Sequence, residues 1–303
     1  MQDPTALFTI GALPDLDQPV LVQALDGFID AGSGRRLARE HLLSALDSEP
    51  LVTFDVDQLV DYRSQRPEMI FTTDHWDGYA APELAVHRVL DLENRSFLLL
   101  HGPEPDMQWE RFTAAVEHLV TTLGVRLLIG LDAIPMAVPH TRPATVIAHG
   151  TPPELVADYP KWLPTVRVPA SVGNLLEYRI GQAGTPSCGF AVAVPHYVAH
   201  LDYPDAAHTL LNRLAGAGDL SLPTEALARA AEVLRGDIDK QVAQSEQIAT
   251  LVQGLERQYD DLTAGRGGGL LADGARLPTA DELAAEFERY LSNRPDSDGD
   301  TAP

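Results

Sequence analysis

Residues 134–143, IPMAVPHTRP, place His140, Thr141 and Arg142 between two prolines. His140 offers an imidazole that can transfer protons near neutral pH, and Arg142 offers a guanidinium that binds carboxylates and phosphates. Proline fixes the backbone and lacks an N–H donor, so the stretch is expected to be a rigid loop, not a helix or a central strand. Such a loop suits an anionic ligand in a crevice, and it suits a junction between subunits equally well.

A turn between a predicted strand and a predicted helix, DGFIDAGSGRRLA (26–38), is the second candidate. Its glycines have the spacing of a nucleotide-binding loop, but the lysine that such a loop needs is missing, which argues against a nucleotide phosphate. What remains is a tight turn around Gly32 whose backbone amides could hold an anion beside Asp26 and Asp30. The two carboxylates also have a structural interpretation, since aspartates often cap helix N-termini.

Three further groups complete the candidate set. Arg63 and Arg66 lie in a polar loop that suits either recognition of an acidic group or a set of surface ion pairs. Glu104 lies between a strand and a helix, where a carboxylate can do acid–base work or complement the helix dipole. His196 opens the sequence HYVAH, which lacks the glutamate of zinc proteases, so we expect no metal site.

The predicted crevice is therefore formed by Asp26, Asp30, Gly32, Arg63, Arg66, Glu104, His140, Thr141, Arg142 and His196. No catalytic residue and no cofactor is predicted, because the G-x-S-x-G turn of the α/β-hydrolases is absent from the sequence. The single cysteine, Cys188, opens an apolar run, where a thiol is usually inert. Whether the chain is an enzyme stays open, with the balance against it.

Alternating strands and helices must position these loops. Apolar runs predict strands at 7–13, 19–25, 51–56, 68–74, 83–93, 96–102, 125–131, 144–150 and 188–194. Helical periodicity predicts helices at 34–46, 109–124, 174–184 and 205–216, the last with Asp205 as its N-cap. Segments 68–74 and 83–93 are expected to pair as a hairpin across the turn HWDGYAAP. This alternation predicts an α/β domain with a mixed, largely parallel sheet and a ligand crevice at the carboxyl ends of its strands.

The pattern changes after residue 221. Residues 222–262 contain few strand formers and predict one long helix with an apolar face, and 277–294 predict a further helix with a capping box. We therefore expect an α/β core at 1–220, a helical hairpin at 221–294 and a disordered acidic tail at 295–303.

The overall charge narrows the range of partners. A net charge of −22 argues against nucleic acid, and no run approaches the roughly 18 apolar residues of a membrane span. The N-terminus lacks the basic and apolar regions of a signal peptide, and a single cysteine points to a reducing compartment. We expect a cytoplasmic protein that binds neither nucleic acid nor membrane.

Taken in order, seven motifs resemble the proteasome assembly chaperone family, in its second-chaperone type and actinobacterial branch: GFIDAG, DQLVDYRSQRP, GPEPDMQWERF, AIPMAVPHTRP, VPASVGNLLEYRIG, VPHYVAHLDYPDAA and LPTADELAAEFERYL. The resemblance spans nearly the whole chain. It implies a three-layer α/β/α sandwich of the phosphorylase- and hydrolase-like kind with a C-terminal helical extension. Relatives in this family bind proteasome α subunits, often through a C-terminal hydrophobic–Tyr–x motif, whereas this chain ends in DGDTAP.

The resemblance and the missing catalytic signatures predict a non-enzymatic protein-binding or assembly factor that forms a homo-oligomer. A trimer is the expected size, and proteasome subunits are the expected partners. The alternative is a protein that binds a small anionic molecule, or a hydrolase-like enzyme, with its site at the carboxyl edge of the sheet.

Overall fold

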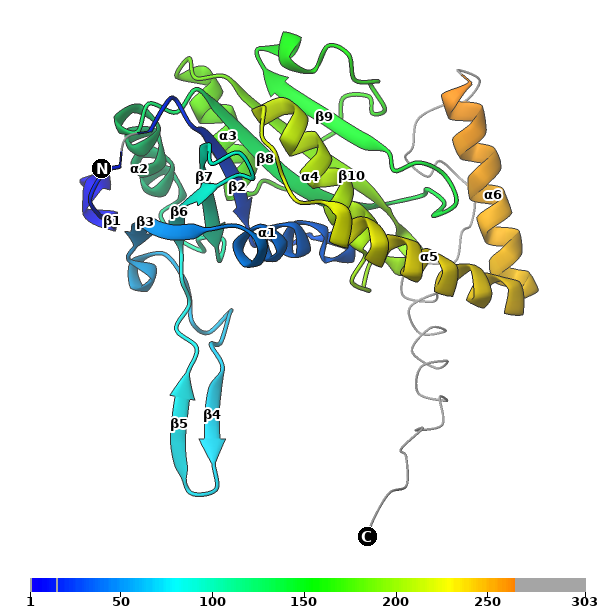
Figure 1. The fold of residues 1–303 in the computed structure, drawn as a ribbon, viewed down its shortest axis with the longest axis horizontal. Helices are drawn as coiled ribbons and strands as arrows, with labels where there is room; N and C mark the ends of the chain where they lie inside the picture. Colours follow the sequence, from blue (N-terminus) through cyan, green and yellow to red (C-terminus); the bar gives the residue numbers. More distant parts are fainter. Residues whose placement is uncertain (1, 15, 265–303) are drawn as a thin grey trace.

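A central sheet of eight strands forms the body of the molecule (Figure 1). The computed structural model describes residues 2–14 and 16–264. In order across the sheet, the strands are β1 (Phe8–Ile10), β3 (Ser48–Phe54), β6 (Ala85–Leu90), β7 (Ser96–Gly102), β2 (Val20–Leu25), β8 (Leu127–Met136), β10 (Ser187–Pro195) and β9 (Val146–Thr151). Strands β7, β2, β8 and β10 are parallel, and the strands on either side of them are antiparallel to their neighbours. The sheet is mixed with a parallel centre, as the sequence predicts.

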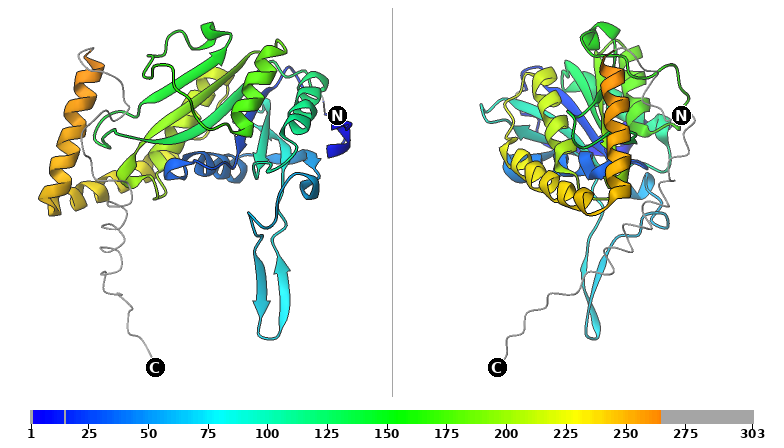
Figure 2. Two further views of the ribbon diagram at one scale, coloured as in Figure 1. Left: turned by 180° about the vertical axis from the view of Figure 1, so that it is seen from behind. Right: turned by 90° about the vertical axis from the view of Figure 1, so that its right-hand side faces the viewer.

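Helices cover both faces of this sheet (Figure 2). Helices α1 (Gly34–Ala45) and α4 (Pro204–Gly218) pack on one face, whereas α2 (Trp109–Thr122) and α3 (Val172–Gln182) pack on the other. The three-layer α/β/α sandwich is thereby confirmed.

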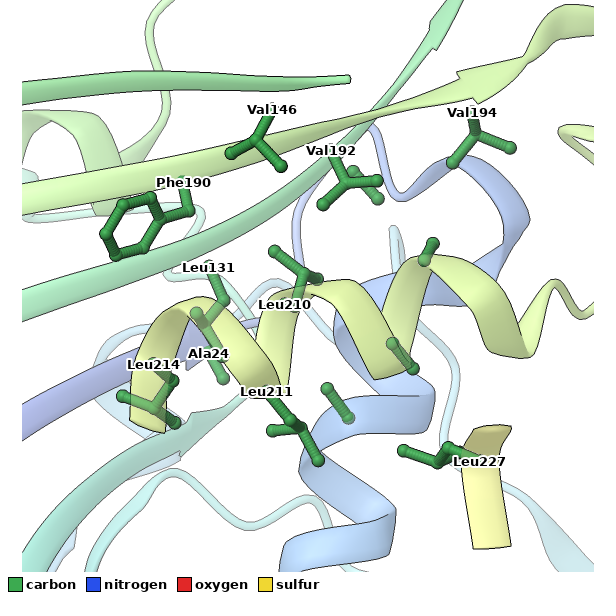
Figure 3. Close-up of a cluster of buried hydrophobic side chains, with 14 of the residues drawn as sticks. Ala24, Leu131, Val146, Phe190, Val192, Val194, Leu210, Leu211, Leu214 and Leu227 are labelled. Carbon is green, nitrogen blue, oxygen red and sulfur yellow. The ribbon is translucent and has the colours of Figure 1, made fainter. Parts of the chain in front are cut away.

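Alternation along β2 shows how the two cores are built. Val20, Val22 and Ala24 face the layer of α1 and α4, and Leu21 and Leu25 face α2 and α3. Figure 3 shows the first of these cores, in which Leu210 of α4 points toward the strands. Because both faces are covered, every residue of β2 is buried, as is typical of parallel strands in α/β proteins.

Strand β8 runs further than the prolines suggest. It continues through Pro135 to Met136, in the stretch that the sequence predicts to be a loop. Strand β2 pairs with β8 only as far as Gly130, and beyond that point the described sheet gives β8 one neighbour, β10. A proline is tolerated where one edge of a strand is unpaired. The loop itself therefore begins at Ala137.

The hairpin expected between 68–74 and 83–93 is wrong. Strand β4 (Met69–Thr72) pairs instead with β5 (His75–Tyr79), which lies inside the expected turn, and β6 pairs with β3 and β7. The chain reverses at Thr73, whose φ of 55° is in the left-handed region that tight turns use. Strands β4 and β5 form a separate two-stranded sheet, which we call the arm, and it projects away from the body (Figures 1 and 2).

The single long helix expected over 222–262 is two helices, α5 (Glu225–Gln244) and α6 (Glu246–Thr263). Ser245 separates them with an extended backbone, and its hydroxyl oxygen accepts a hydrogen bond from the N–H of Ile248. Ser245 thus ends one helix and caps the next. Helix α6 stands at one end of the molecule (Figure 2).

The structure describes only part of the C-terminal region for which the sequence predicts helices. The helix at 277–294, the hairpin that it would complete and the tail at 295–303 lie outside the described residues, so these stay predictions. Leu227 of α5 and Leu255 of α6 join the same core as the sheet and α4. In the part of the chain that the structure describes, no helix has the length and apolar character needed to cross a membrane.

The N-cap of α4 lies two positions before the expected one. The helix begins at Pro204 with Tyr203 as its N-cap, so Asp205 lies in the first turn instead of capping it. Proline is well suited to the first position of a helix, where its missing N–H would have no partner.

Candidate functional site

His140 is a structural residue that ties three elements together. Its backbone N–H donates to the Tyr197 hydroxyl (2.9 Å), and its Nδ1 lies 2.6 Å from the same oxygen. Nε2 lies 3.2 Å from Asp239 of α5, and a carboxylate only accepts, so the neutral ring carries its proton on Nε2 and the Tyr197 hydroxyl donates to Nδ1. The side chain is fully buried, and burial lowers the pKa of His140.

Thr141 and Arg142 bind α6. Thr141 donates to a carboxylate oxygen of Glu256 at 2.6 Å. Arg142 donates two hydrogen bonds to Asp260, each of 2.9 Å, and a third of 3.1 Å to Glu256. The loop between Pro139 and Pro143 therefore binds α6 of the same chain, and we call this set of contacts the clasp.

The turn after β2 is held by its carboxylates. Asp30 accepts hydrogen bonds from the backbone N–H groups of Arg35 (2.8 Å) and Arg36 (2.9 Å) at the start of α1. Asp26 pairs with Arg39 at 2.5 Å. The contacts of Asp30 thus match the structural interpretation, in which its carboxylate caps the N-terminus of the helix. Gly32 is required by its φ of 63° and by Tyr203, whose Cβ would lie 2.6 Å from an added Cβ.

The remaining members of the predicted set are dispersed. Glu104 accepts from the backbone N–H of Val172 at 2.6 Å and so caps α3, and burial raises its pKa. His196 is half-buried in the turn after β10, and burial lowers its pKa. Arg63 and Arg66 are exposed in the loop that leads to the arm. The structure therefore does not gather the predicted residues in one crevice.

A cavity of about 210 Å³ does lie at the carboxyl edge of the sheet, and we call it the edge cavity. None of the predicted site residues lines it. Its polar side chains are Arg35, Asp132, His149, Ser171 and Asn174. Asp30 and Glu104 nevertheless serve it indirectly, because they cap the two helices, α1 and α3, whose first turns form its walls.

Two ion pairs dominate the edge cavity. Arg35, 5% exposed at its side chain, binds Asp132 of β8 at 2.7 Å. On the other wall, Nδ1 of His149 lies 2.7 Å from Glu177 of α3. Burial raises the pKa of Asp132 despite the nearby guanidinium. Burial opposes a charge on His149, but the hydrogen bond to Glu177 and the charges of Glu177 and Asp132 outweigh it and raise the pKa of His149.

Two glycines beside the edge cavity, Gly189 and Gly173, lack side chains that would collide with the neighbouring polar groups. A Cβ added to Gly189 of β10 would lie 2.2 Å from Cε1 of His149 and 2.7 Å from an oxygen of Glu177. A Cβ added to Gly173 of α3 would lie 2.3 Å from Nε2 of the buried Gln23. Side chains at these positions would displace the polar cluster, so the backbone itself is shaped around it.

Sequence reasoning missed this cluster, although signals for it exist. Asp132 interrupts an otherwise apolar strand, LLIGLDAI, where a charge needs a partner. Gly130 and Gly189 interrupt two predicted strands, which often marks a close approach of other groups. In the sequence, Arg35 looks like an ordinary polar residue of an amphipathic helix. Its partner, Asp132, is distant in the sequence and is brought close to it only by the fold.

Neither a metal centre nor a reactive thiol emerges from the described residues. Within 2–14 and 16–264, no group of three or more His, Cys, Asp or Glu residues could hold a metal ion. Burial raises the pKa of Cys188 to about 12, so its thiol stays protonated near neutral pH.

These features define a three-layer α/β protein with a polar cavity at the carboxyl edge of its sheet and a projecting β-hairpin arm. A family model, the PAC2 family, matches residues 24–242. The chain belongs to the PAC2 family. A comparison with curated proteins finds no match.

Solved structures of similar proteins agree with this assignment. The Mycobacterium tuberculosis protein Rv2714, of unknown function, is 47% identical over 86% of this chain and 90% of its own, with a TM-score of 0.81. A Corynebacterium glutamicum protein of unknown function is 36% identical over 86% of this chain and 99% of its own, with a TM-score of 0.82. Rv2125 of Mycobacterium tuberculosis, described as a proteasome-assembly chaperone homologue, is 26% identical over 77% of this chain and 99% of its own, with a TM-score of 0.71.

Proposed function

We propose that this chain is a protein-binding assembly factor that acts as a homo-oligomer and makes its contacts through the arm. The observation that carries the proposal is the exposure of the arm's apolar side chains. Five of them are each between 49% and 63% exposed: Met69, Ile70, Phe71, Trp76 and Tyr79. Exposed apolar groups in this concentration are typical of surfaces that bind other proteins.

The construction of the arm supports the same proposal. Its two strands pair only with each other, and a two-stranded hairpin on its own is marginally stable in water. The rings of Phe71 and Trp76 pack edge to face with their centroids 5.2 Å apart, which gives the arm one apolar cluster that a partner can cover. An arm of this kind is stabilised when another chain buries it.

A second copy of the chain is the partner that we propose for the arm, with a trimer as the assembly. A projecting element that docks on a neighbour forms a closed ring when the rotation between copies closes, and closed symmetry is the usual form of a soluble oligomer. The description of Rv2125 as a proteasome-assembly chaperone homologue supports proteasome subunits as further partners. The proposal places the protein in the cytoplasm and gives it no catalytic step.

The oligomeric state tests the role of the arm. We expect sedimentation velocity to show a trimer for the full chain and a monomer for the double variant Phe71→Ser/Trp76→Ser. Val233→Ser removes an apolar side chain of similar exposure, 68%, from α5 and is expected to leave the trimer intact. A monomeric wild-type chain, or a double variant with the wild-type mass, contradicts the proposal.

A binding measurement tests the proteasome-related part separately. Purified actinobacterial proteasome α subunits are mixed with the full chain and the mixture is separated by size-exclusion chromatography with light scattering. Co-elution as a complex of defined mass supports the proposal. Separate elution at micromolar concentrations of both proteins contradicts this part and leaves the self-association result standing.

A further inference from the structure

The connection between β9 and α3 contains a stretch that is joined to the rest of the protein by no hydrogen bond. Among the described residues, neither a hydrogen bond nor an ion pair engages residues 160–170, PKWLPTVRVPA, which we call the open segment. Most of its residues are exposed. Pro164 and Pro169 have no N–H, so residues 165–168 are the longest central run that can pair without interruption. Unpaired N–H and C=O groups on an exposed stretch are a template for another strand.

Residues 165–168, TVRV, have the composition of a strand although they form none in this chain. Threonine and valine are β-branched and are favoured in strands. Side chains alternate along an extended chain, so Val166 and Val168 share one face and Arg167 lies on the other. Val166 is 42% exposed and Val168 68%. Val168 lines the edge cavity together with Phe28, which is 60% exposed, so this apolar face lacks a cover.

The arm lacks what the open segment offers. Strands β4 and β5 pair only with each other, so each has one edge without a neighbouring strand. Independent stability of a small sheet requires three or more strands with an apolar face. In its own chain the arm projects clear of the body, and no hydrogen bond among the described residues joins it to the open segment (Figures 1 and 2). A third strand for the arm therefore comes from a second copy.

The charges of the two surfaces are complementary. Residues 159–176 contain two basic residues and no acidic one, whereas residues 68–80 contain three acidic residues and no lysine or arginine. Arg167 and Asp77 are both exposed, and neither forms an ion pair among the described residues. Asp77 lies in β5, which favours β5 over β4 as the receiving edge. An exposed pair of this kind contributes little affinity, but it fixes the register of the strands.

We propose that residues 165–168 of one copy pair with β5 of the next copy as the third strand of its arm. In this register Arg167 lies opposite Asp77, and Val166 and Val168 lie against the apolar side chains of the arm. Each copy supplies one arm and one open segment, which is the head-to-tail contact that closes into a ring. The inference rests on the proposed self-association through the arm and adds the surface that receives it.

A disulfide between copies tests the register. Asp77→Cys/Arg167→Cys places a thiol at each of the two positions. Directly opposite residues of paired strands have Cβ atoms about 4.5–5.5 Å apart, close to the spacing of a disulfide. After mild oxidation with diamide, a non-reducing denaturing gel is expected to show most of the chain as covalent multimers. Native Cys188 does not compete, because it is buried and its pKa is raised to about 12.

A second thiol elsewhere in the open segment is the matched control. Asp77→Cys/Lys161→Cys moves it by six residues, roughly 20 Å along an extended chain, and is expected to run as a monomer on the same gel. Asp77→Cys alone is also expected to run as a monomer. Multimers in either control, or a disulfide at the monomer mass in Asp77→Cys/Arg167→Cys, overturn the proposed pairing.

The apolar face is tested without a cross-link. Val166→Ser/Val168→Ser changes two exposed side chains, and we expect it to raise the dissociation constant of the oligomer at least about tenfold in sedimentation velocity. Leu155→Ser, 41% exposed at the start of the same connection, is expected to leave this constant unchanged.

The outcomes separate this inference from the assembly role. If Phe71→Ser/Trp76→Ser is monomeric while the valine variant associates as the wild type does and no cross-link forms, the arm docks elsewhere; this inference is then wrong and the assembly role stands. A monomeric wild-type chain overturns both.

Discussion

His101 lies near the end of β7 with its ring packed edge-on against His87, the ring centroids 4.5 Å apart. Its Nε2 is buried and has no hydrogen-bond partner among the described residues. Burial, followed by the positive charge of His87, lowers the pKa of His101 to about 4. The folded protein thus keeps this ring neutral under conditions in which the unfolded chain protonates it.

That difference makes stability depend on pH in a definite direction. Between about pH 6.5 and pH 4 the unfolded chain binds more protons at His101 than the folded chain does, so the free energy of unfolding decreases as the pH is lowered through this window. Burial also lowers the pKa values of His140 and His196, and they act in the same direction. His149, with its raised pKa, acts in the opposite direction and stabilises the fold below its unfolded pKa.

We expect His101 alone to reduce the free energy of unfolding by about 3 kcal/mol between pH 7 and pH 4. His101→Leu occupies the same buried position without a titrating group, so the stability of this variant should depend less steeply on pH. Urea denaturation at the two pH values measures the difference. His118→Gln, exposed on α2, is the control and should show the full wild-type decrease. An equally steep decrease in His101→Leu would show that other groups carry it.

At the scale of elements, local patterns in the sequence predict most of the sandwich. The strands at 19–25 and 96–102 and the helices at 34–46 and 109–124 match β2, β7, α1 and α2 to within about two residues at each end. These elements have strong apolar periodicity, which burial on a sheet or under a helix reinforces.

The elements that were mispredicted depend on weaker or longer-range signals. The sequence predicts a turn at β5 because Gly78 and Pro82 outweigh Trp76 and Tyr79 in a local count. The break between α5 and α6 is marked only by the capping serine Ser245, and no proline or glycine at that position signals the end of a helix. The pairing of β9 with β10, across the whole of α3, follows from the fold and has no local trace.

The candidate site shows the same limit more strongly. The sequence predicts that the stretch 134–143 presents Thr141 and Arg142 as polar groups, but the residues that bind them, Glu256 and Asp260, lie more than a hundred positions later. The edge cavity joins Arg35, Asp132 and His149 from three separate elements. Spacing within a motif cannot reveal a site that only the sheet order assembles.

The clasp on α6 leads to a prediction at this scale. Arg142→Ala removes both N–H contacts to Asp260 and the one to Glu256, and it leaves Asp260 and Glu256 as like charges on one helix face. We expect the amides of α6 to exchange hydrogen several-fold faster while those of β2 and β8 stay unchanged, because local opening draws on local contacts. Hydrogen exchange with mass spectrometry measures this.

Arg257 offers a matched comparison on the same helix. Its Nε donates to the carbonyl oxygen of Gln253 at 3.2 Å, within α6, so Arg257→Ala removes a charge without touching the loop. Wild-type protection in Arg257→Ala with lost protection in Arg142→Ala assigns the effect to the clasp. Equal protection in all three proteins would mean that apolar packing of Val252 and Leu255 alone holds the helix.

At the scale of the whole molecule, the net charge opposes self-association, whereas the apolar arm favours it. The chain carries a net charge of −22, so two copies repel at low ionic strength, where the Debye length at 0.01 M salt is about 30 Å. The exposed side chains that we assign to the contact, among them Phe71 and Trp76, are apolar, and salt does not weaken their burial.

Self-association through the arm should therefore strengthen as salt is added. Between 10 mM and 300 mM NaCl we expect the dissociation constant of the oligomer to fall by roughly tenfold, since screening removes most of the repulsion and leaves the apolar contact. Sedimentation velocity over a dilution series at each salt concentration gives this value. The variant Phe71→Ser/Trp76→Ser should stay monomeric at both, because screening supplies no attraction of its own. A wild-type oligomer that dissociates as salt rises would instead be held by ion pairs between copies, and the arm would not be its principal contact.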